Sequence, residues 1–166
     1  VNFQGGENFV CDKSIIFELD DAGNKDKVVQ YLSARPTGVI ETAEMAGISE
    51  IYPEAFMETG VSSVDFKDAE LLDVPSLAFA STPKLFAVYL NRGCLSISED
   101  AFKDSALQYI EIPATVNYID NNAFSGTTSK SALTFYCEDD SNAKIYADKN
   151  GIKTTTKPDD THYTVT

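Results

Sequence analysis

The sequence is poor in the side chains that most catalytic sites use. It has no tryptophan, three cysteines and one histidine, His162, in 166 residues. A Ser-His-Asp or Cys-His arrangement would need His162, which lies in a polar tail. Zinc sites need more histidines or clustered cysteines, and singly spread glycines form no phosphate loop. The sequence therefore predicts no catalytic residue, no cofactor and no metal.

Basic residues are also scarce. There are 13 lysines and arginines against 26 acids, a net charge of −13. Phosphate contacts depend on Lys and Arg, so this balance argues against nucleic acid and anionic lipid as partners. No apolar run approaches the roughly 20 residues of a membrane span. The sequence starts at Val1 without Met, which we interpret as a processed or truncated chain, so the missing export signal carries little weight.

The three cysteines, Cys11, Cys94 and Cys137, are an odd number. Cys94 and Cys137 occupy positions that are apolar elsewhere in the sequence, so both are expected inside as small hydrophobes. We predict three free thiols and no Cys94–Cys137 bridge. Free thiols do not exclude export.

Two acidic clusters contain ligands of the kind that calcium prefers. The segment 20–26 has four Asp or Asn residues, but it lacks the EF-hand spacing and its terminal Glu. A plain turn is the better interpretation. Asp139 and Asp140 are more simply explained as the start of a helix, and no pair of acids is spaced to suggest glycoside hydrolysis.

The most regular feature of the sequence is a repeated motif. The dipeptide Ala-Phe recurs at spacings of 23, 23 and 22 residues, and an apolar residue lies four and seven positions before each Ala. The dipeptides are Ala55-Phe56, Ala78-Phe79, Ala101-Phe102 and Ala123-Phe124; the apolar residues are Ile51, Val74, Ile97 and Ile119, and Ile48, Leu71, Cys94 and Val116. A fixed period in the twenties indicates a solenoid. We expect the four Phe side chains to be buried in one row.

A second pattern follows each Ala-Phe pair. Apolar residues alternate in Leu107-Gln-Tyr-Ile110-Glu-Ile112, and the same holds for segments 61–66, 85–90 and 133–137. Alternation with a period of two is typical of a strand with one buried face. Each repeat is therefore expected to hold a short strand, a turn, an apolar Ile or Val residue and the Ala-Phe pair.

These motifs resemble the BspA-like leucine-rich repeats of bacterial surface proteins. The segments Val116–Phe124 and Ile97–Pro113 follow the family pattern, and 140–152 is similar to its closing segment. The sequence departs from it at Glu58-Thr59 and Ser81-Thr82, and it lacks the asparagine ladder of typical leucine-rich repeats. The resemblance implies an α/β fold: a right-handed solenoid of about four 23-residue repeats, with a parallel sheet on its concave face and caps at both ends.

We expect a single domain over residues 1–166, with an N-terminal cap at 1–47, repeats at 48–137 and a C-terminal cap and tail at 138–166. The N-terminal cap is predicted to hold a strand at 9–19, a turn at 20–26, a short amphipathic helix at 27–33 and a strand at 37–42. The C-terminal cap is predicted to hold a helix from Asp140 or Ser141 to Lys149, with Gly151 at its C′ position, and a strand at 152–156.

Alternate strand residues should point away from the core. The predicted ligand-binding residues on this concave face are Asp65, Lys67, Tyr89, Asn91, Tyr109, Glu111, Thr134 and Tyr136. Three are tyrosines on neighbouring strands, expected to be at least partly exposed, and tyrosine suits protein or sugar contacts. The plainer explanation is that tyrosine favours strands.

The family resemblance implies a non-catalytic, cell-surface or secreted module that binds a protein, matrix or glycan. The alternative is a structural spacer within a larger surface protein, with no ligand of its own. A hydrolase has little support in the sequence.

Overall fold

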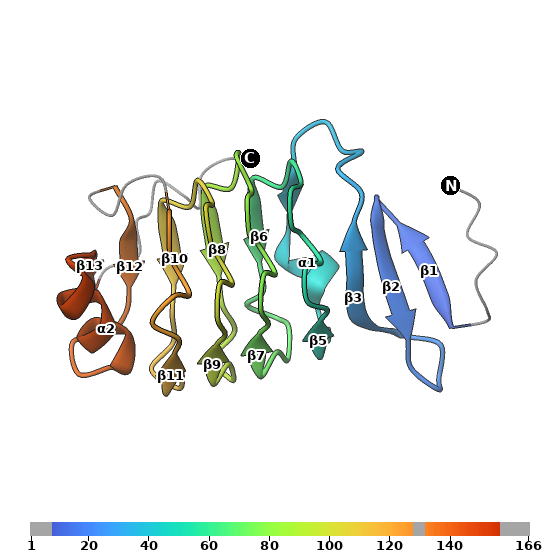
Figure 1. The fold of residues 1–166 in the computed structure, drawn as a ribbon. Coiled ribbons are helices and arrows are strands. Elements are labelled where there is room, and N and C mark those ends of the chain that lie inside the picture. Colours follow the sequence, from blue (N-terminus) through green and yellow to red (C-terminus); the bar gives the residue numbers. More distant parts are fainter. Residues whose placement is uncertain (1–7, 128–131, 157–166) are drawn as a thin grey trace.

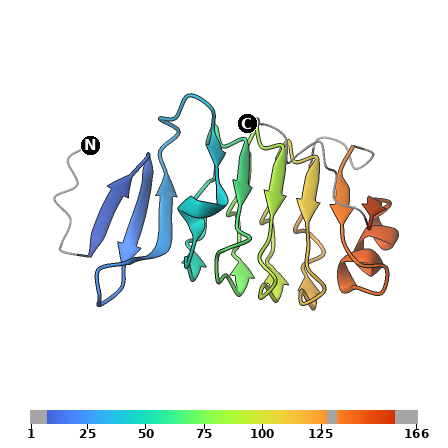
Figure 2. The same cartoon turned by 180° about the vertical axis from the view of Figure 1, so that it is seen from behind.

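The protein is described by a computed structural model over residues 8–127 and 132–156. Short strands lie side by side along one axis, and the chain passes back and forth between a six-stranded sheet and two smaller sheets (Figures 1 and 2). The larger sheet is parallel, with the order β13-β12-β10-β8-β6-β4. Its strands are β4 (Val39–Ile40), β6 (Ser63–Asp65), β8 (Ala87–Tyr89), β10 (Tyr109–Glu111), β12 (Thr134–Tyr136) and β13 (Lys153–Thr155).

The strands between these form the other side of the stack. A three-stranded parallel sheet holds β7 (Asp73–Val74), β9 (Ser96–Ile97) and β11 (Tyr118–Ile119). A four-stranded sheet, ordered β1-β2-β3-β5, holds β1 (Phe9–Asp12), β2 (Ile15–Leu19), β3 (Lys25–Tyr31) and β5 (Glu50–Ile51). One turn of chain from the larger sheet to the smaller and back is one coil, and the parallel strands and the coiled path agree with the sequence-based prediction.

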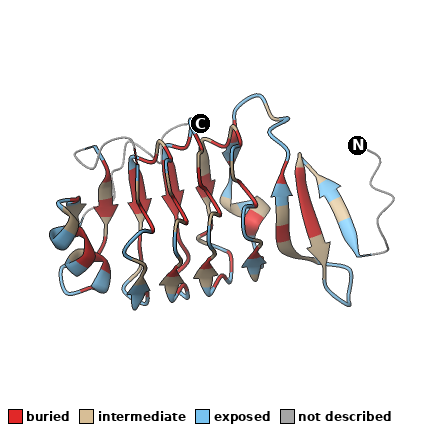
Figure 3. Ribbon diagram, viewed as in Figure 1, coloured by how far each residue is buried: buried red, intermediate tan, exposed pale blue. Residues whose placement is uncertain are grey.

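The Ala-Phe pairs form the centre of the core. Phe56, Phe79, Phe102 and Phe124 are all at most 2% exposed, which confirms the prediction. Their rings stack nearly parallel, with centroids 4.7, 5.2 and 5.0 Å apart. Each coil is also tied to the next through the backbone, because the N–H of Phe56 donates to the Ala78 carbonyl, and Phe79 and Phe102 repeat this bond. The buried residues run as a continuous line through the stack (Figure 3).

A hydroxyl lies three residues after each of these Phe residues. Thr59, Thr82, Ser105 and Thr127 are buried. The hydroxyls of Thr59, Thr82 and Thr127 donate to the carbonyl of the preceding Phe at 2.6–3.1 Å, which closes the turn from inside. Sequence reasoning missed this column. The signal was present as a Thr or Ser at a constant offset from Ala-Phe.

Backbone conformation repeats with the same period. The second residue after each Phe has a positive φ: Glu58, Ser81, Asp104 and Gly126, at 58°, 53°, 54° and 67°. Only glycine adopts this left-handed region freely. A side chain on Gly126 would in addition collide with the carboxylate of Asp104.

The N-terminal cap differs from the prediction. Residues 9–19 form two strands joined by a tight turn at Lys13 and Ser14, both with positive φ, and residues 25–31 form β3 instead of a helix. A register shift in the β2–β3 pairing leaves Val29 bulged, so that Val28 and Tyr31 both face the core. A bulge thus gives a strand the three-residue spacing of a helix. The Tyr31 ring lies 6.0 Å from Phe56 and extends the aromatic row.

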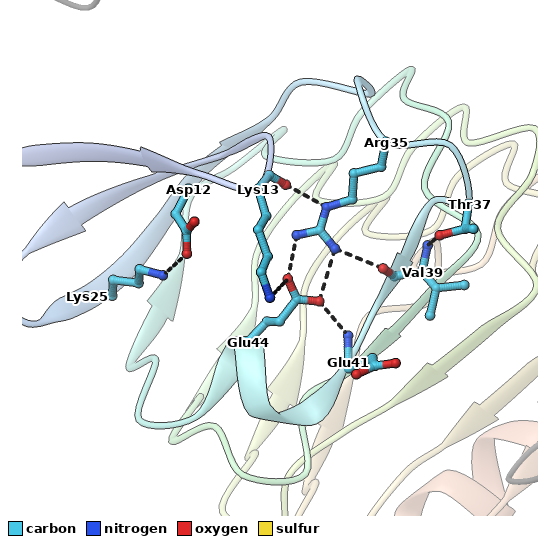
Figure 4. Close-up of polar contacts among 8 residues, drawn as sticks. All are labelled: Asp12, Lys13, Lys25, Arg35, Thr37, Val39, Glu41 and Glu44. Carbon is cyan, nitrogen blue, oxygen red and sulfur yellow. Dashed lines mark hydrogen bonds and ion pairs between the residues drawn. The ribbon is translucent and has the colours of Figure 1, made fainter. Parts of the chain in front are cut away.

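A partly buried ion pair fastens this cap to the first coil (Figure 4). Arg35 binds Glu44 through both terminal nitrogens, and it also donates to the carbonyls of Lys13 and Val39. Glu44 belongs to α1 (Thr42–Met45), a short helix that the sequence did not predict, and it accepts the Glu41 N–H in a capping box. Both side chains are under 15% exposed.

The C-terminal cap follows the prediction closely. The helix α2 (Asn142–Asn150) begins after Ser141, whose hydroxyl accepts the Lys144 N–H, and ends at Gly151 with φ 68°. Tyr146 packs its ring 5.9 Å from Phe124 and closes the aromatic row. Cys94 and Cys137 are buried as predicted, and all three thiols, with exposed Cys11, are free.

Candidate ligand-binding face

The outer face of the six-stranded sheet carries two rows of side chains. Parallel register aligns Asp65, Tyr89, Glu111, Tyr136 and Thr155 in one row. The second row holds Ser63, Ala87, Tyr109, Thr134 and Lys153. Six of the eight predicted site residues therefore lie on one face, because parallel strands of equal register place equivalent residues side by side.

Lys67 follows β6 and spans the middle of this face. Its ammonium lies 5.0 Å from the centre of the Tyr89 ring and 3.3 Å from the Glu111 carboxylate. The cation thus crosses β8 to reach an acid two coils away. This arrangement combines a cation–π contact with an ion pair.

The predicted exposure of the tyrosines was wrong for two of the three. Tyr89 and Tyr109 are only 7% and 3% exposed, whereas Tyr136 is half-buried. Tyr109 lies opposite the small Ala87, and its ring packs 5.8 Å from that of Tyr89. Aromatic side chains on strands under 5 Å apart cover one another's faces. Tyr89, Tyr109 and Ala87 therefore form a small apolar cluster on this face, separate from the main core.

Asn91 was also placed wrongly on the surface. It is 4% exposed, and its amide nitrogen donates to the Leu71 carbonyl of the preceding coil at 2.9 Å. The strand ends at Tyr89, so alternation no longer decides where Asn91 points. Its role in the structure is to tie two coils together.

Asp65 lies half-buried at the edge of the face. Burial is the main cause that raises the pKa of its carboxyl above the usual value, and the charge of Glu111 adds to this rise. The Lys67 N–H, which donates to the carboxylate at 2.9 Å, and the Lys67 charge both act to lower the pKa. A carboxyl held in this way can donate or accept a hydrogen bond near its pKa.

A cavity of about 450 Å³ adjoins these rows at the carboxyl ends of β8, β10 and β12. Its walls bring Arg92, Glu111, Tyr136, Glu138 and Asp139 around the apolar Ile112 and Pro113. Pockets in which a few polar groups converge around an apolar surface are common ligand sites. The cavity offers one guanidinium, several carboxylates and a phenol, a set that suits hydroxyl-rich or basic ligands.

The acidic residues of the described part of the chain do not gather into a metal site. Residues 8–127 and 132–156 contain no group of three or more His, Cys, Asp or Glu side chains that could hold a metal ion. The Asp20 carboxylate accepts the N–H groups of Ala22 and Asn24, which is the turn that the sequence predicts. His162 lies outside the described residues.

Comparison with known proteins agrees with this architecture. Residues 43–154 match the family described as BspA type leucine rich repeat region, in six copies. The chain belongs to the BspA type leucine-rich repeat family. No curated protein was found to match it.

Two solved structures share the fold of this BspA type chain. A leucine-rich repeat protein from Bacteroides capillosus ATCC 29799 has 25% identity and a TM-score of 0.63, over 80% of this chain and 99% of its own. A leucine rich cell surface protein from Faecalibacterium prausnitzii A2-165 has 23% identity and a TM-score of 0.53, over 92% of this chain. The match covers 44% of that protein, so the second likeness shows the fold alone.

The BspA type repeats explain which residues are structural. The Ala-Phe pairs and the apolar columns lie within the matched residues 43–154 and form the core, with exposures near zero for most of them. The polar residues of the outer sheet face and of the 450 Å³ cavity lie outside this core. Among the described residues, no helix is both long and apolar enough to cross a bilayer.

Proposed function

We propose that this chain is a non-catalytic binding module at a cell surface or in a secreted protein. Membership of the BspA type repeat family supports this localisation, since the sequence resembles the repeats of bacterial surface proteins. The ligand would be a protein, matrix component or glycan held on the outer face of the six-stranded sheet. We also infer about four repeats of 23 residues that wind right-handed, since parallel crossover connections are nearly always right-handed.

One observation supports this assignment best: the 450 Å³ cavity continues the row of polar side chains on the same face. Tyr136 and Glu111 belong both to that row and to the cavity wall. We propose Asp65, Lys67, Glu111, Thr134 and Tyr136 as ligand contacts. Tyr89 and Tyr109 would act as a stiff support under Lys67, and Asn91 is structural.

A binding screen against glycans and host matrix proteins tests the proposal. The double variant Thr134→Ala/Tyr136→Ala should weaken the binding of a hit by about tenfold or more, because truncating a central aromatic contact typically has this effect. The control is Ile145→Ala, an exposed residue on α2 outside this sheet. Equal binding by all three proteins would contradict the site.

The second candidate function is a structural spacer. The support for it is the regularity of the stack, in which Phe rings and backbone hydrogen bonds join successive coils without any ligand. A screen with no hit, together with a gene that encodes many further repeats next to an anchor, would favour the spacer.

A further inference from the structure

The chain itself shows how the outer face of the six-stranded sheet can hold a cation. The Lys67 ammonium lies 5.0 Å from the centre of the Tyr89 ring and 3.3 Å from the Glu111 carboxylate. Strand register places Tyr89 beside Glu111 on the neighbouring strand. An aromatic ring and a carboxylate side by side thus receive the charged end of a lysine, through a cation–π contact and an ion pair.

The same two kinds of group occur again one strand further along. Register places Tyr136 beside Glu111, on the side away from Tyr89. Tyr136 is half-buried, and it lines the 450 Å³ cavity together with Glu111, Glu138 and Asp139. Within the described part of the chain, no cation–π contact involves Tyr136, and no ion pair involves Glu138 or Asp139. This second ring and the two acids therefore have no cation of their own among the described residues.

Apolar side chains make up another part of the cavity wall. Leu90, Ile112 and Pro113 line it; the first two are buried and Pro113 is partly exposed. Lysine and arginine bury their methylene stems along apolar surface and keep the charged end at polar groups. A cavity that combines apolar side chains with carboxylates offers both of the surfaces that such a side chain needs.

The charge of the cavity favours a basic ligand over an acidic one. Three carboxylates line it, those of Glu111, Glu138 and Asp139, together with a single guanidinium, that of Arg92. The chain as a whole has a net charge of −13, so its field also attracts basic partners. A sulfated or sialylated glycan would be repelled by both, and a neutral glycan would gain nothing from the excess of carboxylates.

We propose that the cavity binds a lysine or arginine side chain of a partner protein. The charged end lies at the Tyr136 ring and the carboxylates of Glu138 and Asp139. The methylene stem lies along Ile112 and Pro113. This inference rests on the proposed binding function, and it narrows the ligand from a protein, matrix component or glycan to a protein with an exposed basic residue.

The test uses a blocked tripeptide, acetyl-Leu-Lys-Leu-amide, and follows its binding to the full chain by the amide chemical shifts in nitrogen-15 NMR spectra. Two further peptides replace the lysine by arginine or by acetyl-lysine, because acetylation removes the charge and keeps the stem. We expect the two charged peptides to shift the signals of Ile112, Tyr136 and Glu138. They should bind at least about fivefold more tightly than the acetyl-lysine peptide, and salt should weaken only the charged peptides.

Variants of the cavity test the contacts one kind at a time. Glu138→Gln/Asp139→Asn removes two charges with little change of shape, and it should weaken the lysine peptide about fivefold and leave the acetyl-lysine peptide unchanged. The matched control, Glu70→Gln/Glu99→Gln, removes two charges from exposed side chains outside the cavity and should stay within about twofold. Tyr136→Phe keeps the ring and should keep the affinity, whereas Tyr136→Leu should lower it. The same spectra show whether each variant is folded.

Three results would overturn the inference: no binding of the lysine peptide, equal binding of the lysine and acetyl-lysine peptides, or an equal loss in the two double variants. The binding screen separates this failure from that of the proposed function. If a glycan binds and depends on Thr134 and Tyr136 while the lysine peptide does not bind, the face is a ligand site and only this inference is wrong. If neither the screen nor the lysine peptide gives binding, both are wrong.

Discussion

The ammonium of Lys67 lies 3.3 Å from the carboxylate of Glu111, two coils further along the stack. The same ammonium lies over the Tyr89 ring, 5.0 Å from its centre. We expect Lys67→Ala to make Tyr89 more reactive towards tetranitromethane, measured by peptide mass spectrometry. Both charged side chains are partly exposed, so the loss in free energy of unfolding should be below about 1 kcal/mol. Lys103→Ala removes a comparable surface pair with Asp100 and should leave the nitration of Tyr89 unchanged.

The stacked Phe rings should dominate stability. Phe102→Ala is expected to lower the free energy of unfolding by about 3–5 kcal/mol, because it leaves a cavity between Phe79 and Phe124. Urea denaturation measures the change. Ile145→Ala, on the exposed side of α2, is the control and should cost less than about 0.5 kcal/mol. A loss under about 1 kcal/mol for Phe102→Ala would show that the row is not the core.

A side chain at Gly126 should be tolerated less well than one at Gly47. Gly126→Ala is expected to cost more than Gly47→Ala in thermal melting, because both have positive φ but only Gly126 faces the Asp104 carboxylate. Adding Asp104→Ser to Gly126→Ala should restore the part of the loss that comes from the collision. If Gly47→Ala and Gly126→Ala are equally destabilising, backbone strain alone explains both.

The thiols should react at three different rates. Burial raises the pKa of Cys94 to about 11 and also raises that of Cys137, whereas Cys11 is exposed. Since the thiolate is the reactive form, Ellman's reagent should modify Cys11 first and Cys94 last at neutral pH. Cys11→Ser should remove the fast phase only. In denaturant all three should react, and a missing thiol there would reveal a disulfide.

The Arg35–Glu44 pair should add an acid-sensitive contribution to stability. Burial opposes ionisation of Glu44 most strongly, but Arg35, the Glu41 N–H and Lys13 together hold its pKa below the usual 4.5. The contribution is therefore complete above the unfolded value of 4.5 and is lost as pH falls through the folded value. Glu44→Gln should lower stability at pH 7 by about 1–3 kcal/mol, and the difference from the parent should shrink in acid. A difference that does not change with pH would contradict this explanation.

The sequence predicts the repeated part of this fold well. One pattern repeated four times shows both the length of the repeat and which residues point into the core. Phe56 to Phe124, Cys94 and the α2 cap lie where expected. The N-terminal cap occurs once and offers no internal comparison. There the bulge at Val29 gives the buried residues Val28 and Tyr31 the three-residue spacing that is typical of a helix. The turn at Lys13 and Ser14 contains no glycine, so the sequence does not show that a turn occurs there.

The candidate site was predictable only in part. Strand register places Asp65, Glu111, Thr134 and Tyr136 on one face, and alternation is enough to find them. The alternation of side chains along a strand predicts which way each one points, but not how exposed it is. The burial of Tyr89 and Tyr109 depends on neighbours from other coils, which the pattern of a single strand does not contain.

The Phe-to-Ala backbone hydrogen bonds give successive coils the same donor and the same acceptor. A coil presents the N–H of its Phe on one side and the carbonyl of its Ala on the other, as Phe79 and Ala78 do. A stretch of chain one period long can therefore be removed or duplicated, and the new neighbours still fit. The length of such a protein can change by whole repeats through gene duplication, while the packing of the core between neighbouring coils stays the same.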